Sequence, residues 1–91
     1  MTILEQRKEL VEQLIAQFNT IELDDISWGY DAPTETGEEI EIHLISKDGI
    51  NSSQYKKDCL MLVNEIKNAT GQDVHYDIDM RNTWQFIYII E

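Results

Sequence analysis

The sequence predicts an α+β two-layer sandwich of αββαββ order, with a four-stranded, mostly antiparallel sheet and two helices on one face. Two segments carry apolar residues at the three-four spacing of an amphipathic helix. Each is followed by two segments in which apolar and polar residues alternate, as in half-buried strands. With 91 residues and 42% apolar content, the chain fits a single domain over 1–91.

The first amphipathic segment predicts a helix that begins at Ile3. Thr2 followed by Glu5 matches a capping box, in which the two side chains bond to free backbone N–H groups of the first turn. The apolar positions then recur as far as Phe18, and Arg7 is the only polar residue among them.

The second amphipathic segment predicts a helix that begins near residues 51–52 and stops at Gly71, a residue type that commonly ends helices. The apolar stripe of this helix comprises Tyr55, Cys59, Leu62, Ile66 and Ala69. Because Cys59 lies on the stripe, we expect a small core residue rather than a nucleophile. A lone cysteine also excludes an internal disulfide.

Residues 20–30 and 39–45 predict the first pair of strands. The apolar phase of the earlier strand slips at Asp24–Asp25, which predicts a β-bulge or a bend. A polar loop over 31–37, with the only proline, connects the two strands. The later strand alternates cleanly, with Ile40, Ile42 and Leu44 on one face and Glu39, Glu41 and His43 on the other.

Residues 74–80 and 84–90 predict a second hairpin whose register has two alternatives. Both faces of the last strand are apolar, with Trp84, Phe86, Tyr88 and Ile90 on one and Ile87 and Ile89 on the other. A two-residue turn at Arg81–Asn82 sends Ile87 and Ile89 to the core and places Phe86 opposite Asp77. A three-residue turn reverses the two faces of the strand.

The formal net charge is -11, from 18 acidic and 7 basic side chains, and the acids are concentrated in the predicted sheet. Residues 20–46 contain eight acidic side chains and no Lys or Arg. A field of this sign repels nucleic acid and anionic membranes, so we expect neither as a direct partner, and it attracts basic proteins. Like charges facing each other across strands would also lower stability. The pattern therefore favours a binding role, with solubility alone as the alternative.

Either register of the last hairpin leaves an apolar row beside an acidic row on the face of the sheet that the helices do not cover. This combination is typical of a binding surface with apolar anchors inside an acidic rim. The alternative is a central strand buried on both faces, by the chain itself or by the mate in a homodimer. The predicted partner-binding residues are Glu22, Asp24, Asp25, Asp31, Glu35, Glu38, Glu39, Glu41, Asp77, Asp79, Trp84 and Phe86.

The sequence carries no motif that predicts catalysis. There is no glycine-rich phosphate loop and no G-x-S-x-G nucleophile motif. His43 and His75 with a nearby carboxylate could hold a metal only if their strands were neighbours, and ordinary surface histidines are the simpler interpretation. Asp77 and Asp79 have the spacing of any alternating acidic strand. We therefore expect neither an enzyme, nor a cofactor, nor a bound metal.

Two classes of function remain as hypotheses. The first is a nucleic-acid mimic of the anti-restriction, anti-CRISPR or nuclease-inhibitor type, whose carboxylates occupy the basic groove of a nucleic-acid-binding protein. The second is a toxin-specific immunity protein, or a small acidic adaptor or chaperone, that binds through apolar anchors on the sheet. We expect a cytoplasmic protein, because no signal-peptide pattern and no apolar run of about 20 residues is present.

Overall fold

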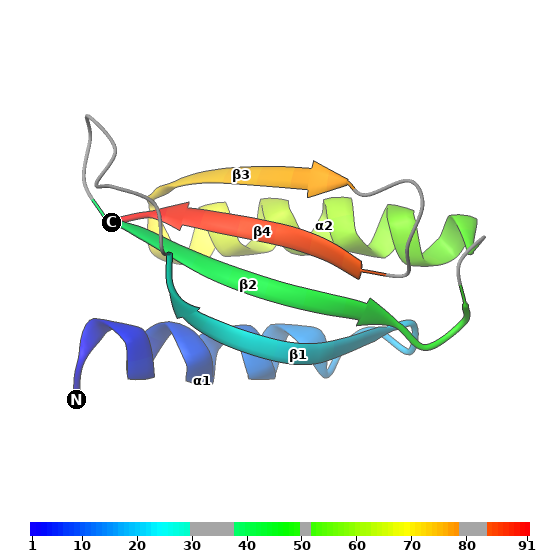
Figure 1. Ribbon diagram of the computed structural model, residues 1–91, viewed down its shortest axis with the longest axis horizontal. Coiled ribbons are helices and arrows are strands. Elements are labelled where there is room, and N and C mark those ends of the chain that lie inside the picture. The colour runs from blue at the N-terminus through cyan, green and yellow to red at the C-terminus, as the bar shows by residue number, and fades with distance from the viewer. Residues whose placement is uncertain (30–37, 50–51, 79–83) are drawn as a thin grey trace.

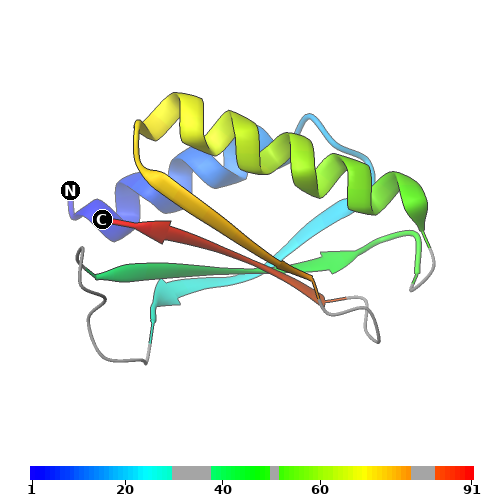
Figure 2. The same cartoon turned by 90° about the horizontal axis from the view of Figure 1, so that it is seen from above.

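A computed structural model describes residues 1–29, 38–49, 52–78 and 84–91 and confirms the predicted α+β fold. The helices and strands follow in the order α1 (Ile3–Ile15), β1 (Ile21–Trp28), β2 (Glu39–Ser46), α2 (Ser53–Thr70), β3 (Asp73–Ile78) and β4 (Trp84–Ile90). The four strands form one sheet in the spatial order β1-β2-β4-β3, and every neighbouring pair is antiparallel. Both helices pack on one face of this sheet (Figures 1 and 2). The other face, which we call the open face, is not covered by a helix of the described residues.

The helix ends agree with the capping signals of the sequence. Thr2 caps α1, and its hydroxyl accepts a hydrogen bond from the backbone N–H of Glu5 at 3.2 Å. Ser52 caps α2 in the same way through Tyr55. Gly71 ends α2 with a φ of 69°, in the left-handed region where a side chain would be strained. Among the described residues, no helix is long and apolar enough to cross a membrane.

The predicted irregularity of the first strand is a β-bulge. Leu23 pairs with Leu44 and Asp25 pairs with His43, so Asp24 is the extra residue of β1. The bulge restores the alternation: Ile21 and Ile26 both face the helices although five positions separate them. Residues that a regular strand would place on opposite faces therefore reach the same core.

The register of the second hairpin is the one that a two-residue turn predicts. Phe86 pairs with Asp77, and Tyr88 pairs with His75. Ile87 and Ile89 consequently point toward the helices and are fully buried. The turn residues themselves lie outside the described residues.

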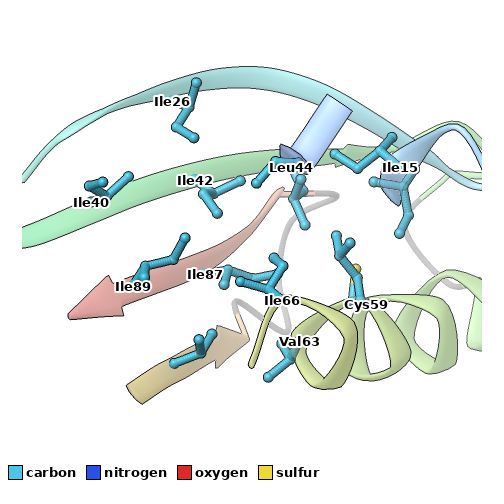
Figure 3. Close-up of a cluster of buried hydrophobic side chains, with 14 of the residues drawn as sticks. Ile15, Ile26, Ile40, Ile42, Leu44, Cys59, Val63, Ile66, Ile87 and Ile89 are labelled. Atoms are coloured by element: carbon cyan, nitrogen blue, oxygen red, sulfur yellow. The ribbon is translucent and has the colours of Figure 1, made fainter. Parts of the chain in front are cut away.

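The core lies between the sheet and the two helices. Ile40, Ile42 and Leu44 of β2 and Ile87 and Ile89 of β4 are fully buried against Cys59 and Ile66 of α2 (Figure 3). Val11 of α1 belongs to the same cluster. These central strands supply most of the branched apolar side chains that are fully buried, and such side chains suit the pleated, tightly packed surface of a sheet. Cys59 of α2 is also buried in this core, as predicted from its place on the apolar stripe.

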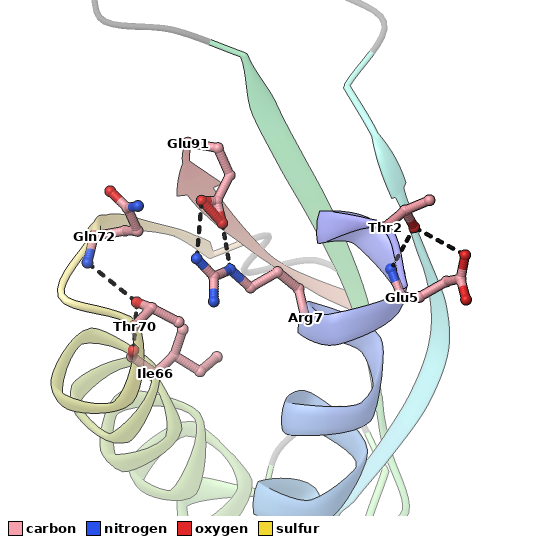
Figure 4. A network of polar contacts seen from close by, with 7 residues as sticks. All are labelled: Thr2, Glu5, Arg7, Ile66, Thr70, Gln72 and Glu91. Carbon is pink, nitrogen blue, oxygen red and sulfur yellow. Dashed lines mark hydrogen bonds and ion pairs between the residues drawn. The ribbon is translucent and has the colours of Figure 1, made fainter.

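Arg7, the one polar residue in the apolar stripe of α1, has a specific partner. Its guanidinium forms a two-point ion pair with the carboxylate of Glu91, directly after β4 (Figure 4). The side chains of Arg7 and Glu91 are only 19% and 7% exposed, so the pair shields both charges from water. This contact connects α1 to the end of the central strand.

Candidate protein-binding surface

The open face is built from alternate residues of all four strands. On β2 the burial alternates strictly: Ile40, Ile42 and Leu44 lie under the helices, and the residues between them are partly exposed on the open face. The pairing of the strands extends this phase across the sheet. The open-face residues are Glu22, Asp25 and Ser27 of β1; Glu39, Glu41, His43 and Ile45 of β2; Phe86, Tyr88 and Ile90 of β4; and Asp73, His75 and Asp77 of β3.

Two rows cross the middle of the open face from one edge strand to the other. The first row runs Asp25, His43, Phe86, Asp77, and the second runs Ser27, Glu41, Tyr88, His75. Phe86 and Tyr88 of β4 therefore each have one carboxylate and one imidazole as their direct cross-strand neighbours. Such neighbours lie about 5 Å apart at Cβ, which is close enough for their side chains to contact one ligand group together.

All charges of fixed sign in the strands are negative. Seven acidic residues lie in β1, β2 and β3, and the four strands contain no Lys or Arg. The helices are balanced by comparison, because three acids and two bases lie in α1 while two acids and three bases lie in α2. The charge segregation that the sequence suggested is thus a difference between the two layers of the fold.

One expectation about this charge is wrong for the described strands. The sequence suggested that like charges would face each other across strands, but in the described pairings no acid lies directly opposite another acid. Between β1 and β2 the cause is the register, which places Asp25 opposite His43 and Glu41 opposite Ser27. Between β2 and β3 the cause is the strand order, since β4 has no charged residue and lies between them. Glu41 and Asp77 are thereby kept on opposite sides of the aromatic residues, so carboxylates surround this strand at a small cost in stability.

His43 and His75 each contact a carboxylate of their own strand, and His43 also contacts an aromatic ring of β4. His43 Nε2 lies 3.3 Å from a carboxylate oxygen of Glu41, and its ring meets the ring of Phe86 edge to face at 4.9 Å. His75 Nε2 lies 3.1 Å from a carboxylate oxygen of Asp73.

The metal hypothesis required the strands of the two histidines to be neighbours, and β4 lies between them. Within the described ranges, no group of three or more His, Cys, Asp or Glu side chains is arranged to hold a metal ion.

Most of the predicted site residues that the structure describes lie on or beside the open face. Asp25, Asp77 and Glu22 are exposed there, and Glu39, Glu41 and Phe86 are partly exposed. Asp24 is exposed at the bulge, and Glu38 is exposed directly before β2. Asp31, Glu35 and Asp79 lie outside the described residues. The same is true of the side chain of Trp84, whose backbone pairs with Ile45.

Two residues of this surface were missed by the sequence analysis. Tyr88 occupies the centre of the second row, and its phase, which it shares with Phe86, was the available signal. Asp73 begins β3, one residue before the predicted strand, and it was not among the predicted partner-binding residues. Ile90 has the same phase but is buried at 8% exposure, so Phe86 and Tyr88 are the aromatic residues that remain partly exposed.

Three titratable side chains on the helix side of the sheet, Cys59, Tyr55 and Tyr76, have pKa values raised by burial. Burial raises the pKa of the Cys59 thiol to about 11, so it stays protonated near neutral pH. Burial likewise raises the pKa values of Tyr55 and Tyr76 above the ordinary tyrosine value. The Tyr76 hydroxyl donates to the Gln85 side-chain carbonyl at 3.0 Å, which satisfies a polar group that is only 1% exposed.

The open face offers carboxylate oxygens and aromatic rings, a combination that recognises cations. No protein-family model matches the chain, and the search of curated proteins likewise returns no significant match.

Proposed function

We propose that this protein is a non-enzymatic inhibitor whose open face occupies the nucleic-acid site of a basic partner protein. The observation that carries the proposal is the charge of the sheet, in which seven acids and no Lys or Arg are held on strands while the helical layer is balanced. A groove that binds nucleic acid is lined with Lys and Arg, and such a groove is attracted to a surface of this sign. The cytoplasm is the compartment in which we expect this encounter.

The rigidity of the sheet supports the comparison with a nucleic acid. Alternate residues along a strand are about 7 Å apart, and neighbouring strands are about 4.8 Å apart, so the open-face carboxylates form a regular array. Asp25 and Asp77 end the same row and are separated by two intervening strands. Negative charges held at fixed positions mimic a phosphate backbone better than the same charges on a mobile tail, because no ordering entropy is lost on binding.

A second candidate function draws support from the aromatic residues. Phe86 and Tyr88 remain partly exposed at the centre of the surface, where apolar anchors of protein interfaces commonly lie. A toxin-specific immunity protein, or a small acidic adaptor or chaperone, would use them as anchors and the acids as a rim. The same open face serves both candidates, but different residues provide the affinity.

Capture from a lysate of the native host, followed by competition, tests the first candidate. The proposal expects the captured protein to be basic, to be released by double-stranded DNA, and to lose affinity steeply as salt rises from about 0.1 M to about 0.5 M. A tight complex that neither DNA nor salt weakens would contradict nucleic-acid mimicry.

Two sets of variants then separate the candidates. The double change Glu41→Gln with Asp77→Asn removes two charges from the open face, and Glu9→Gln with Glu12→Gln removes two exposed charges from α1 as a matched control. Mimicry predicts that the first pair weakens binding more than Phe86→Ala does, and that the control pair has little effect. An apolar anchor predicts the reverse ranking of the first two.

A further inference from the structure

The centre of the open face has a feature that net charge alone does not require. Phe86 pairs with Asp77 on one side, and Tyr88 pairs with Glu41 on the other. Both rings belong to a strand without charged residues. Asp77 and Glu41 therefore each lie directly opposite an aromatic ring of β4 instead of opposite another carboxylate. The surface therefore contains two mixed sites, each made of one ring and one acid on adjacent strands.

The contacts of these residues limit how the two sites can move. The ring of Phe86 is supported by the imidazole of His43 at 4.9 Å, with an interplanar angle of 86°. His43 in turn lies 3.3 Å from the Glu41 carboxylate. One chain of contacts thus runs from the ring of the first site to the acid of the second. Sites held in this way lose less conformational entropy when a ligand binds.

The two cationic side chains of proteins fit such a site differently. The arginine guanidinium is planar and weakly hydrated, so it can stack on a ring while its edge donates hydrogen bonds to a carboxylate. The lysine ammonium is compact and strongly hydrated, and it interacts with an acid mainly as a point charge. A ring directly opposite a carboxylate favours arginine for this reason, whereas an acidic surface without rings would attract both.

We infer that the open face binds arginine side chains of its partner in preference to lysine, one at Phe86 with Asp77 and one at Tyr88 with Glu41. This inference rests on the proposed function and specifies the partner as a protein whose exposed basic segment is rich in arginine. The two sites are two residues, or about 7 Å, apart along β4, and they lie on opposite sides of this strand.

Binding of two synthetic peptides of equal length and charge, one of arginine and one of lysine, tests the inference at about 0.15 M salt. We expect the full-length protein to bind the arginine peptide about tenfold more tightly, as stacking at two sites would provide. Phe86→Leu with Tyr88→Leu should abolish the preference and keep the weaker, charge-driven binding of both peptides. Phe86→Tyr should retain the preference. Thermal unfolding of each variant confirms that it is folded.

A matched control comes from the opposite side of the molecule. Leu60 and Met61 of α2 are 51% and 53% exposed, and their change to alanine removes apolar surface without touching the open face. These changes should leave both affinities unaltered. A preference for arginine that survives in the double leucine variant would overturn the two sites.

Different results of the peptide experiment would overturn the arginine preference and the proposed function. Equal affinity for the two peptides in the unaltered protein would overturn the arginine preference and leave charge-driven inhibition standing. Absence of binding to either peptide would overturn both.

Discussion

The two faces of the sheet are made by the same strands and show opposite physical chemistry. On β4, Ile87 is fully buried against the helices, and its neighbour Phe86 is partly exposed among carboxylates and imidazoles. The helix side is stabilised by the removal of branched apolar side chains from water. The open face carries the charge and contributes little packing. The difference indicates that stability and recognition are carried by alternate residues, which can be changed separately.

The largest expected difference is between alanine variants of the adjacent residues Ile87 and Phe86 of β4. Ile87→Ala should lower the free energy of unfolding by about 2–5 kcal/mol, because a fully buried side chain leaves a cavity. Phe86→Ala should cost only about 1 kcal/mol, because its ring is partly exposed. Urea denaturation measures both. Equal losses that depend on protein concentration would show instead that β4 is buried on both faces, as in a homodimer.

The decrease of stability at alkaline pH reports on the buried Cys59 thiol on the helix side of the sheet. The Cys59 thiol has an ordinary pKa of 9.0 and a folded-state pKa of about 11, so the unfolded chain loses this proton first as pH rises. The stabilisation is complete below pH 9 and is lost as pH approaches 11, by up to about 1.4 kcal/mol per pH unit. Denaturation between pH 8 and about pH 10 measures the slope. Cys59→Ala should reduce the slope of the free energy of unfolding against pH. An unchanged slope in this variant would show that other groups cause the pH dependence.

The contact between Arg7 and Glu91 tests how the helical layer is joined to the sheet. Arg7→Met keeps the packing of the stem but leaves a mostly buried carboxylate without its partner, so we expect a loss of about 2 kcal/mol. The double variant with Glu91→Gln should recover part of that loss, because the unpaired charge is removed. A double-mutant cycle by urea denaturation gives the coupling. A coupling near zero would mean that solvent already screens the pair.

Removal of charge from the open face should have the smallest effect on stability. Glu41→Gln with Asp77→Asn should change the free energy of unfolding by no more than about 0.5 kcal/mol, because neither acid lies opposite another acid. The same variant should weaken partner binding, so function and stability would respond differently. Thermal unfolding measures the change in stability, and a binding assay on the same variant measures the change in affinity. A large rise in stability would show that repulsion on this face is stronger than the pairing implies.

Local patterns were sufficient to predict the helices and strands. The capping residue Thr2, the terminating Gly71 and the alternation of β2 all act through neighbours within a few residues, and the structure confirms each. The slip at Asp24–Asp25 predicted a bulge or a bend, because a change of apolar phase must be absorbed where it occurs, and the structure contains the bulge. The partner of Arg7 could not be predicted in this way, since Glu91 is distant in sequence and close only in the folded chain.

The candidate surface was predictable in composition and not in arrangement. Acids and aromatic residues on the strands are evident in the sequence, but their neighbours depend on which strands pair. The second hairpin had two registers with opposite faces, and the structure contains the one that buries Ile87 and Ile89. Burial of these side chains under the helices, together with the fixed alternation of a strand, places Phe86 and Tyr88 on the open face.

The sequence by itself determined the element order, the helix caps, the bulge and the concentration of acids in the sheet, because each is a property of residues close together in the chain. Only the tertiary structure decided the strand order β1-β2-β4-β3. That order inserts an uncharged strand between two acidic ones, and it therefore decides that Glu41 and Asp77 each lie opposite an aromatic ring. Pairing between distant strands is governed by the packing of the whole core against two helices, which no local pattern encodes.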